Sequence, residues 1–332
     1  GTLTITDDKN DDGSVKKKDK IGNAVGGDTG TLLAGGCYMG AGIGGGSYQG
    51  DYYLEDKKDE VSTSNITITG GKITASGGEY AAGIGGGAHG DASNIRIEGN
   101  ADVTAFGCDG AAIGAGWESS GNSDITITDH ATVEAASEEG CGIGGSKGDC
   151  GKVTVTISGH ASVHAEALDH AAAIGSQGSS ATVNIKDHAD VTAVSTGVAI
   201  GTGFGTDGIG SHGMGATSTV INITGGTVNA VTSSNESKPA IGTLYGNLDV
   251  TINSSTGKTT VNAYTTSSDP QSLNIGTGRY DSSAGKYRTS PSEGAEYKED
   301  GSSNLGESNA AIINMLVNFF IGFSVGANVA TS

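Results

Sequence analysis

One short segment recurs seven times along this chain, and its period limits the folds that the chain can adopt. The copies begin at residues 65, 94, 124, 154, 182, 220 and 249, and read "NITITGGKITA", "NIRIEGNADVTA", "DITITDHATVEA", "TVTISGHASVHA", "TVNIKDHADVTA", "VINITGGTVNA" and "DVTINSSTGKTTVNA". Their equivalent Ile residues are spaced by 29, 30, 30, 28, 38 and 29 positions, and "TLTIT" at residue 2 begins an earlier copy. Such a period is typical of a solenoid, in which each repeat stacks on its neighbours because it cannot close a core alone.

Each repeat contains three strand-like segments: an alternating "IxI" pair, the Val or Ile of "VTA", and the Ile of a "GIGG" or "AIG" element. Alternating Val, Ile and Thr between Gly-rich corners predict strands, and no segment of a repeat has the 3.6-residue period of a helix. We therefore predict an all-β solenoid of about eight coils, each of about 30 residues with three short strands.

Stacked repeats should place equivalent apolar residues in columns. One predicted column contains Ile43, Ile84, Ile113, Ile143, Ile174, Ile200, Ile241 and Ile275. A second contains Ile73, Val103, Val133, Val163, Val191, Val228 and Val261, and the "IxI" pairs form a third wall. The 59 glycines fit this architecture, because the backbone must turn sharply in every coil and glycine accepts positive φ without a steric penalty.

The pairing of "ITITGGKITASGG" with "AAGIGGG" resembles repeats of large bacterial surface proteins that are often labelled carbohydrate-binding or pectate-lyase-like. The resemblance covers about residues 60 to 265. It implies a right-handed parallel β-helix. We predict that this β-helix extends over residues 1–280, with insertions near 7–40, 47–63 and 203–217, and that the protein lies outside the cell or at its surface. With 37 acidic and 18 basic residues, the net charge of −19 argues against nucleic acid and anionic membranes as partners.

Ring-bearing side chains lie four or five residues after the Ile of the first column. They are Tyr48, His89, Trp117, Phe204, Tyr245 and Tyr280. On adjacent coils these rings would form an outward strip suited to sugar rings, since aromatic faces provide apolar area at a small entropic cost. The alternative is that each ring caps the edge of its own coil.

Residues 8–19, "DKNDDGSVKKKD", resemble the calcium loops of EF-hand and dockerin modules. The resemblance implies oxygen ligands from Asp8, Asn10 and Asp12, a sharp turn at Gly13 and a closing carboxylate from Asp19. The alternative is a solvated charged insertion, because three lysines crowd the segment and no proper exiting helix follows. Calcium is the only cofactor that the sequence suggests.

Three histidines, His130, His160 and His188, occupy one repeat position, with Asn100 in the preceding copy. A metal-binding ladder is one interpretation. We favour a turn requirement, because Gly-Gly pairs at 70–71 and 225–226 occupy the same corner, and Gly, Asn and His are tolerated or enriched in the left-handed region.

A polysaccharide lyase or glycoside hydrolase would need an arginine beside calcium carboxylates, or clustered acidic residues. Arg96 instead interrupts an outward column whose other members are Thr67, Thr126, Thr156, Asn184, Asn222 and Thr251. A flat threonine array also suggests ice binding, but Arg96 breaks this column, and Glu134 and His164 break its neighbour at Thr74, Thr104 and Thr192.

Residues 310–330, "AAIINMLVNFFIGFSVGANVA", have no charge and are long enough to span a bilayer as a helix. They resemble an early helix of multidrug and toxic compound extrusion transporters, which implies a membrane-type segment and no transport activity. A helix capping the open end of the solenoid is the alternative. Residues 281–309, rich in Ser, Gly, Glu and Lys, predict a flexible linker.

The function favoured by these patterns is a non-catalytic surface or adhesion-type module that binds a glycan through the corner aromatics. A polysaccharide lyase or glycoside hydrolase, a structural spacer and an ice-binding solenoid are the alternatives. The scarcity of arginine, at 96, 279 and 288 only, and the lack of a repeated acid pair argue against catalysis.

Overall fold

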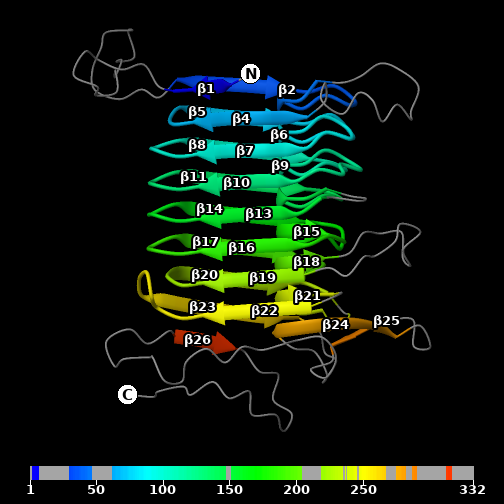
Figure 1. The fold of residues 1–332 in the computed structure, drawn as a ribbon, viewed down its shortest axis with the longest axis vertical. Coiled ribbons are helices and arrows are strands. Elements are labelled where there is room, and N and C mark those ends of the chain that lie inside the picture. Colours follow the sequence, from blue (N-terminus) through cyan, green and yellow to red (C-terminus); the bar gives the residue numbers. More distant parts are fainter. Residues whose placement is uncertain are drawn as a thin grey trace.

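The computed structural model describes residues 2–6, 30–46, 62–146, 151–203, 218–234, 236, 238–244, 247–266, 274–281, 286–289 and 312–315. For residues 64, 277–281, 286–289 and 312–315 only the backbone is considered. All regular structure in these ranges is β-strand, and none of them contains a helix. The strands form three sheets that run the length of the molecule (Figure 1).

The first sheet contains β1 (Leu3–Ile5), β4 (Thr63–Ile68), β7 (Ala92–Ile97), β10 (Ser123–Ile127), β13 (Val153–Ile157), β16 (Ala181–Ile185), β19 (Ser218–Ile223) and β22 (Asn247–Ile252). The second contains β2 (Thr31–Gly35), β5 (Lys72–Ser76), β8 (Asp102–Gly107), β11 (Thr132–Ser137), β14 (Ser162–Ala167), β17 (Asp190–Ser195), β20 (Gly226–Thr232), β23 (Thr259–Thr265) and β26 (Ile312–Met315). The third contains β3 (Ile43–Gly44), β6 (Ile84–Gly85), β9 (Ile113–Gly114), β12 (Ile143–Gly144), β15 (Ile174–Gln177), β18 (Ile200–Gly203), β21 (Ile241–Thr243), β24 (Ile275–Asp281) and β25 (Lys286–Thr289).

Apart from β25, strands three apart in the sequence are neighbours in each sheet, and they pair in parallel. The chain therefore visits the three sheets in turn and then starts the next coil directly below the last (Figure 1). The fold is an all-β parallel β-helix of the right-handed type. The number of coils stays a prediction, because parts of the first and last coils lie outside the described residues.

The predicted columns are confirmed. Ile43, Ile84, Ile113 and their successors to Ile275 pair in register along the third sheet. The column from Ile73 to Val261 runs along the second sheet in the same way. Within a strand the inward side chains are buried and the outward ones half-buried or exposed, as in the alternating pattern of β13. These columns join into one continuous core.

The glycine after each column Ile is architectural. Gly114 has φ +142°, and a Cβ at this position would collide with the backbone carbonyl oxygen of Gly144 in the next coil. A Cβ at Gly85 would collide with Gly114 in the same way. Close approach of neighbouring coils and an unusual φ therefore both require glycine here.

Three strands lie where the sequence predicted other structure. β2 falls within the insertion predicted near 7–40, because Thr31–Gly35 continues the second sheet beside β5. β25 falls within the predicted linker and pairs antiparallel with β24. β26 falls within the helix predicted over 310–330, and its backbone pairs with the otherwise open edge of β23.

Pairing with an open sheet edge satisfies backbone groups that a helix would leave unpaired on β23, which explains a strand at Ile312–Met315. The rest of 310–330 lies outside the described residues, so the transporter-like helix is not confirmed. Among the described residues, no helix is long and apolar enough to cross a membrane.

Candidate functional site

Four rings from neighbouring corners meet at one place, and we call them the corner aromatic cluster: Tyr38, Tyr80, His89 and Trp117. The Trp117 ring lies 5.0 Å from the Tyr80 ring and 5.0 Å from the His89 ring, measured between centroids. Tyr38 packs edge-on against Tyr80 at 5.2 Å. These spacings are typical of attractive aromatic contacts, so the rings form one connected surface.

The backbone holds the cluster together. Tyr80 follows β5 and Trp117 follows β9, so the two residues come from different corners of adjacent coils. The Trp117 N–H donates to the Tyr80 carbonyl at 2.9 Å, and the His89 N–H donates to the Trp117 carbonyl at 2.7 Å. The Tyr80 N–H donates to the Tyr38 carbonyl at 2.9 Å. Backbone hydrogen bonds between the four residues therefore hold the rings in fixed positions relative to one another.

Three residues at the cluster have left-handed backbone. The φ angles are +45° at Tyr38, +62° at His89 and +51° at Glu118. Histidine is enriched in this region among non-glycine residues, whereas tyrosine and glutamate rarely occupy it, and each of these costs about 1 to 3 kcal/mol unless the surroundings over-determine it. Glycine would relieve this strain, so the large side chains at these positions point to a role beyond the turn.

The rings are partly open to solvent and flanked by carboxylates. Tyr38 is 54% exposed, and Tyr80, His89 and Trp117 are half-buried. The Glu118 carboxylate lies 3.8 Å from His89 Nδ1. A hydrogen bond to the Glu79 carboxylate, and to a lesser extent one to Tyr38, raises the pKa of Tyr80. The cluster thus offers apolar faces beside acceptors for hydroxyl groups.

The structure brings together two of the six predicted ring residues, His89 and Trp117. Tyr48, Phe204 and Tyr245 lie outside the described residues, and for Tyr280 only the backbone of β24 is described. The calcium-loop candidates Asp8, Asn10, Asp12 and Asp19 also lie outside. These predictions stay untested.

The sequence pattern did not predict Tyr38 and Tyr80, because the predicted rings follow the column Ile whereas these two precede Ile43 and Ile84. The signal that could have found them is the register itself. The corner before one column Ile lies beside the corner after another, as the hydrogen bond between Trp117 and Tyr80 shows.

The three equivalent histidines form a stacked ladder on the surface. The rings of His130 and His160 lie 5.1 Å apart, and those of His160 and His188 lie 4.9 Å apart, with interplanar angles of 11° and 25°. Stacked rings do not converge on a common point. Within the described residues, no group of three or more His, Cys, Asp or Glu side chains could hold a metal ion.

The turn requirement proposed for the histidines applies to a different residue. The left-handed positions are Gly99, Asp129, Gly159 and Asp187, each one residue before the ladder position. The histidines follow that turn, and their N–H groups bond to the coil above, as from His130 to the Gly99 carbonyl at 2.9 Å. Gly71 and Gly226 have positive φ in the shorter copies.

Lys238 fills a later corner between the second and third sheets, the position that Tyr80 occupies in its own coil. The corner between β17 and β18 is short, residues 196–199, while the corners before and after it span 168–173 and 233–240. Lys238 from the longer corner reaches across, and its side chain is fully buried. Its Nζ lies 2.6 Å from His170 Nδ1 and 2.9 Å from Glu236 Oε2, and donates to the Thr196 carbonyl at 3.3 Å.

This closed corner has its own electrostatics. Burial lowers the pKa of Lys238, and the Glu236 carboxylate opposes that shift. Burial, followed by the charge of Lys238, lowers the pKa of His170. A neutral His170 can accept the hydrogen bond from Lys238 at Nδ1, because its proton then sits on Nε2. The lysine is enclosed, so this corner has a structural role.

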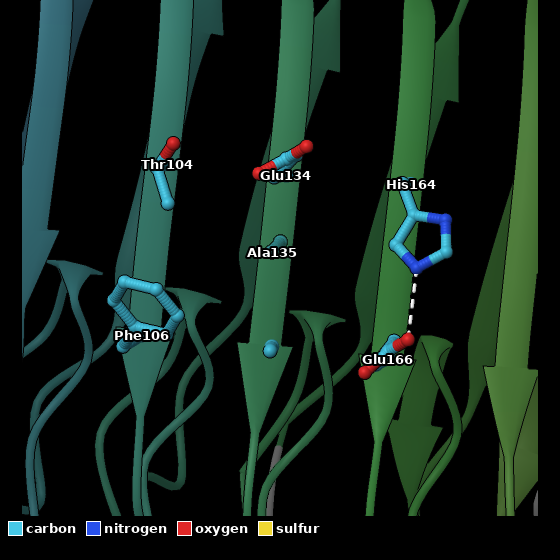
Figure 2. A pocket seen from close by; sticks show the side chains of 7 residues that line it. Thr104, Phe106, Glu134, Ala135, His164 and Glu166 are labelled. Atoms are coloured by element: carbon cyan, nitrogen blue, oxygen red, sulfur yellow. Dashed lines mark hydrogen bonds and ion pairs between the residues drawn. The ribbon is translucent and has the colours of Figure 1, made fainter.

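A hollow of about 280 Å³ lies on the outer face of the second sheet (Figure 2). Its lining residues are Thr104, Phe106, Glu134, Ala135, Ala136, His164 and Glu166. It contains two carboxylates but neither arginine nor lysine, so it lacks the arginine expected beside the carboxylates of a polysaccharide lyase. Arg96 lies on the first sheet, where it pairs with Glu98 at 2.7 Å, as expected of a surface substitution.

Four segments of the sequence match a known family model. A model described as a beta helix repeat matches residues 66–88, 95–117, 125–147 and 221–246. No curated protein and no solved structure shows significant similarity to the chain. The matched segments contain strands of all three sheets together with Tyr80 and Trp117. The chain is thus similar to beta helix repeats in the segments that contain Tyr80 and Trp117, while Tyr38 and His89 lie outside the matched residues.

Proposed function

We propose that this chain is a non-catalytic β-helix module of an extracellular or cell-surface protein, and that it binds carbohydrate through the corner aromatic cluster. The observation that carries the proposal is the position of Trp117 between Tyr80 and His89, each ring 5.0 Å away. Connected, half-exposed rings provide a platform on which the apolar face of a sugar ring can stack.

The surroundings of the rings favour a ligand that has both an apolar face and hydroxyl groups. Glu79 and Glu118 are exposed beside the cluster and can accept hydrogen bonds from sugar hydroxyls. The backbone hydrogen bonds between corners keep the platform rigid in the absence of ligand. A rigid platform loses little entropy on binding, which favours affinity.

A glycan array probed with the full chain tests the proposal. We expect binding to a subset of glycans, and we expect Trp117→Ala to weaken it by about 2 kcal/mol, or about thirtyfold, while the melting temperature changes little. Tyr264→Ala is the matched control, because Tyr264 is a half-buried outward aromatic on β23 and distant in the stack from the cluster.

Running the array with calcium and with a chelator separates the cluster from the segment 8–19. Binding that requires calcium and tolerates Trp117→Ala would move the site to Asp8, Asn10, Asp12 and Asp19. No binding to any glycan would overturn the proposal and leave the spacer function ahead.

A further inference from the structure

The hollow on the outer face of the second sheet has a regular geometry, which we describe as two rows of side chains. Paired positions on β8, β11 and β14 place Thr104, Glu134 and His164 in one row. The other row contains Phe106, Ala136 and Glu166. Neighbouring side chains in a row are separated by about 4.8 Å, the spacing between strands.

The hollow exists because Ala136 is small. Phe106 and Glu166 stand on either side of it, two strands apart, so their Cα atoms are separated by about 10 Å. Phe106 is 46% exposed and forms one wall of the depression. Glu166 forms the opposite wall, and Glu134 and His164 close the upper side (Figure 2).

The hydrogen bond between His164 and Glu166 orients both side chains. His164 Nε2 lies 2.9 Å from Glu166 Oε1, and a carboxylate can only accept, so the proton belongs to Nε2. In the neutral ring, Nδ1 is then left as an acceptor. The Thr104 hydroxyl in the same row can both donate and accept.

The charge of the hollow is one-sided. Glu134 and Glu166 contribute two carboxylates, and the lining includes neither lysine nor arginine. The remaining ionisable side chain of the lining, His164, occupies Oε1 of Glu166, which leaves Oε2 and the Glu134 carboxylate for a ligand. An aromatic face beside carboxylates attracts a cation on two grounds, because the ring quadrupole and the negative charges act in the same direction. The apolar floor and the Phe106 ring also require a ligand with an apolar face.

We propose that this hollow binds an amino sugar, with the protonated amine between Glu134 and Glu166 and the sugar ring against Phe106. A sugar ring suits the site better than a linear polyamine does. The Thr104 hydroxyl and the His164 ring offer partners for ring hydroxyls, and a polyamine would use the carboxylates alone. The hollow is separate from the corner aromatic cluster, because it shares no residue with it.

Titration calorimetry of the full chain with a glucosamine tetramer tests this inference. We expect binding, at least tenfold weaker binding of the N-acetylated tetramer, and weaker binding as salt increases. Glu134→Gln and Phe106→Ala should each weaken glucosamine binding by about tenfold. Asp124→Asn is the matched control for lost charge, because Asp124 is an exposed carboxylate on the first sheet.

Three outcomes would overturn the inference. Equal affinity for the N-acetylated tetramer and the glucosamine tetramer would show that the hollow does not recognise the amine. Equal weakening by Glu134→Gln and Asp124→Asn would show attraction to the net charge of the chain rather than to the hollow. Spermidine binding as tightly as the tetramer, with the same dependence on Glu134, would identify a site for linear polyamines.

The two sites can also fail separately. If Trp117→Ala removes binding of neutral glycans and leaves glucosamine binding intact, both assignments stand. If glucosamine binding depends on Trp117 and not on Glu134, the amine site is wrong and the corner aromatic cluster takes both ligands.

Discussion

The same corner of the helix, between the second and third sheets, is built in two opposite ways in the two halves of the molecule. After β5 it is open, and Tyr80 stands half-exposed among other rings. After β20 it is closed, and Lys238 is fully buried over a short neighbouring corner. The columns inside are the same in both halves, so the corners are where the repeats differ and where we expect function to differ.

The two corners differ in how much side-chain surface they leave accessible, and this distinguishes a binding surface from a structural contact. Lys238 contacts His170, Glu236 and Thr196 of its own module, and nothing remains for a ligand to reach. The rings of the corner aromatic cluster contact each other and still expose area. We therefore expect substitutions at the closed corner to change stability, and substitutions at the open corner to change binding.

The largest effect is expected from a substitution that disrupts the close packing of the coils, which both corners share. Gly114→Ala would force a Cβ into the carbonyl of Gly144 at an unfavourable φ, and we expect a loss of at least about 3 kcal/mol in the free energy of unfolding. Gly178→Ala is the control, because Gly178 has φ +82° but open space around it, and should cost only about 1 kcal/mol. Urea unfolding measures both, and equal losses would show that close packing of the coils is not what requires glycine.

The next effect is specific to the closed corner. Lys238→Ala removes the ion-pair partner of the Glu236 carboxylate and creates a void over Thr196. We therefore expect a loss of about 3 kcal/mol in the free energy of unfolding. Glycan binding should not change. A variant that unfolds like the wild type in urea would mean that the lysine contributes nothing to closing this corner.

A smaller effect depends on pH. The pKa of His170 is lowered below 6.5 in the folded chain, so the folded state binds fewer protons than the unfolded state. Stability then rises with pH between the folded-state pKa and about 6.5, and is lost as pH falls through that window.

We expect the melting temperature to fall between pH 7 and pH 5, and His170→Asn to reduce this fall. Asparagine tolerates the φ of +53° at this position and can still accept a hydrogen bond from Lys238. His188→Asn is the matched control for the loss of a histidine, because His188 is exposed and lies outside the closed corner. An identical pH profile in wild type and His170→Asn would contradict the electrostatics of the closed corner.

The smallest effect belongs to the open corner. Tyr80→Phe removes the hydroxyl beside Glu79 and keeps the ring that stacks on Trp117, so we expect less than about 0.5 kcal/mol change in the free energy of unfolding. Thermal melting of Tyr80→Phe and of Lys238→Ala under the same conditions measures how far the two corners differ in their contribution to stability. A loss as large as that from Lys238→Ala would make the open corner structural as well.

The repeated parts of the fold could be predicted from the sequence, because the period repeats the same physical requirement in every coil. The register of Ile84 on Ile113 followed from alignment alone. Strand β26 could not be found this way, because Ile312–Met315 belongs to no repeat and pairs with β23 across a long gap in sequence.

The site was predicted only in part, because its contacts cross between coils. Trp117 and His89 follow the periodic Ile and were found, whereas Tyr80 precedes it and was not. The sequence pattern did not indicate a role for Lys238, since this side chain fills space beside the short corner 196–199 of the preceding coil. Glu134 and His164 were noticed only as breaks in a threonine column, and those breaks mark the hollow.

The most direct test of the account is calorimetric titration of Trp117→Ala and Lys238→Ala, as full chains, with the glycan that binds the wild type best. We predict that Trp117→Ala loses about thirtyfold in affinity and that Lys238→Ala binds as the wild type does below its own melting temperature. Undiminished binding by Trp117→Ala, or equal loss in both variants, would contradict a binding site at the corner aromatic cluster.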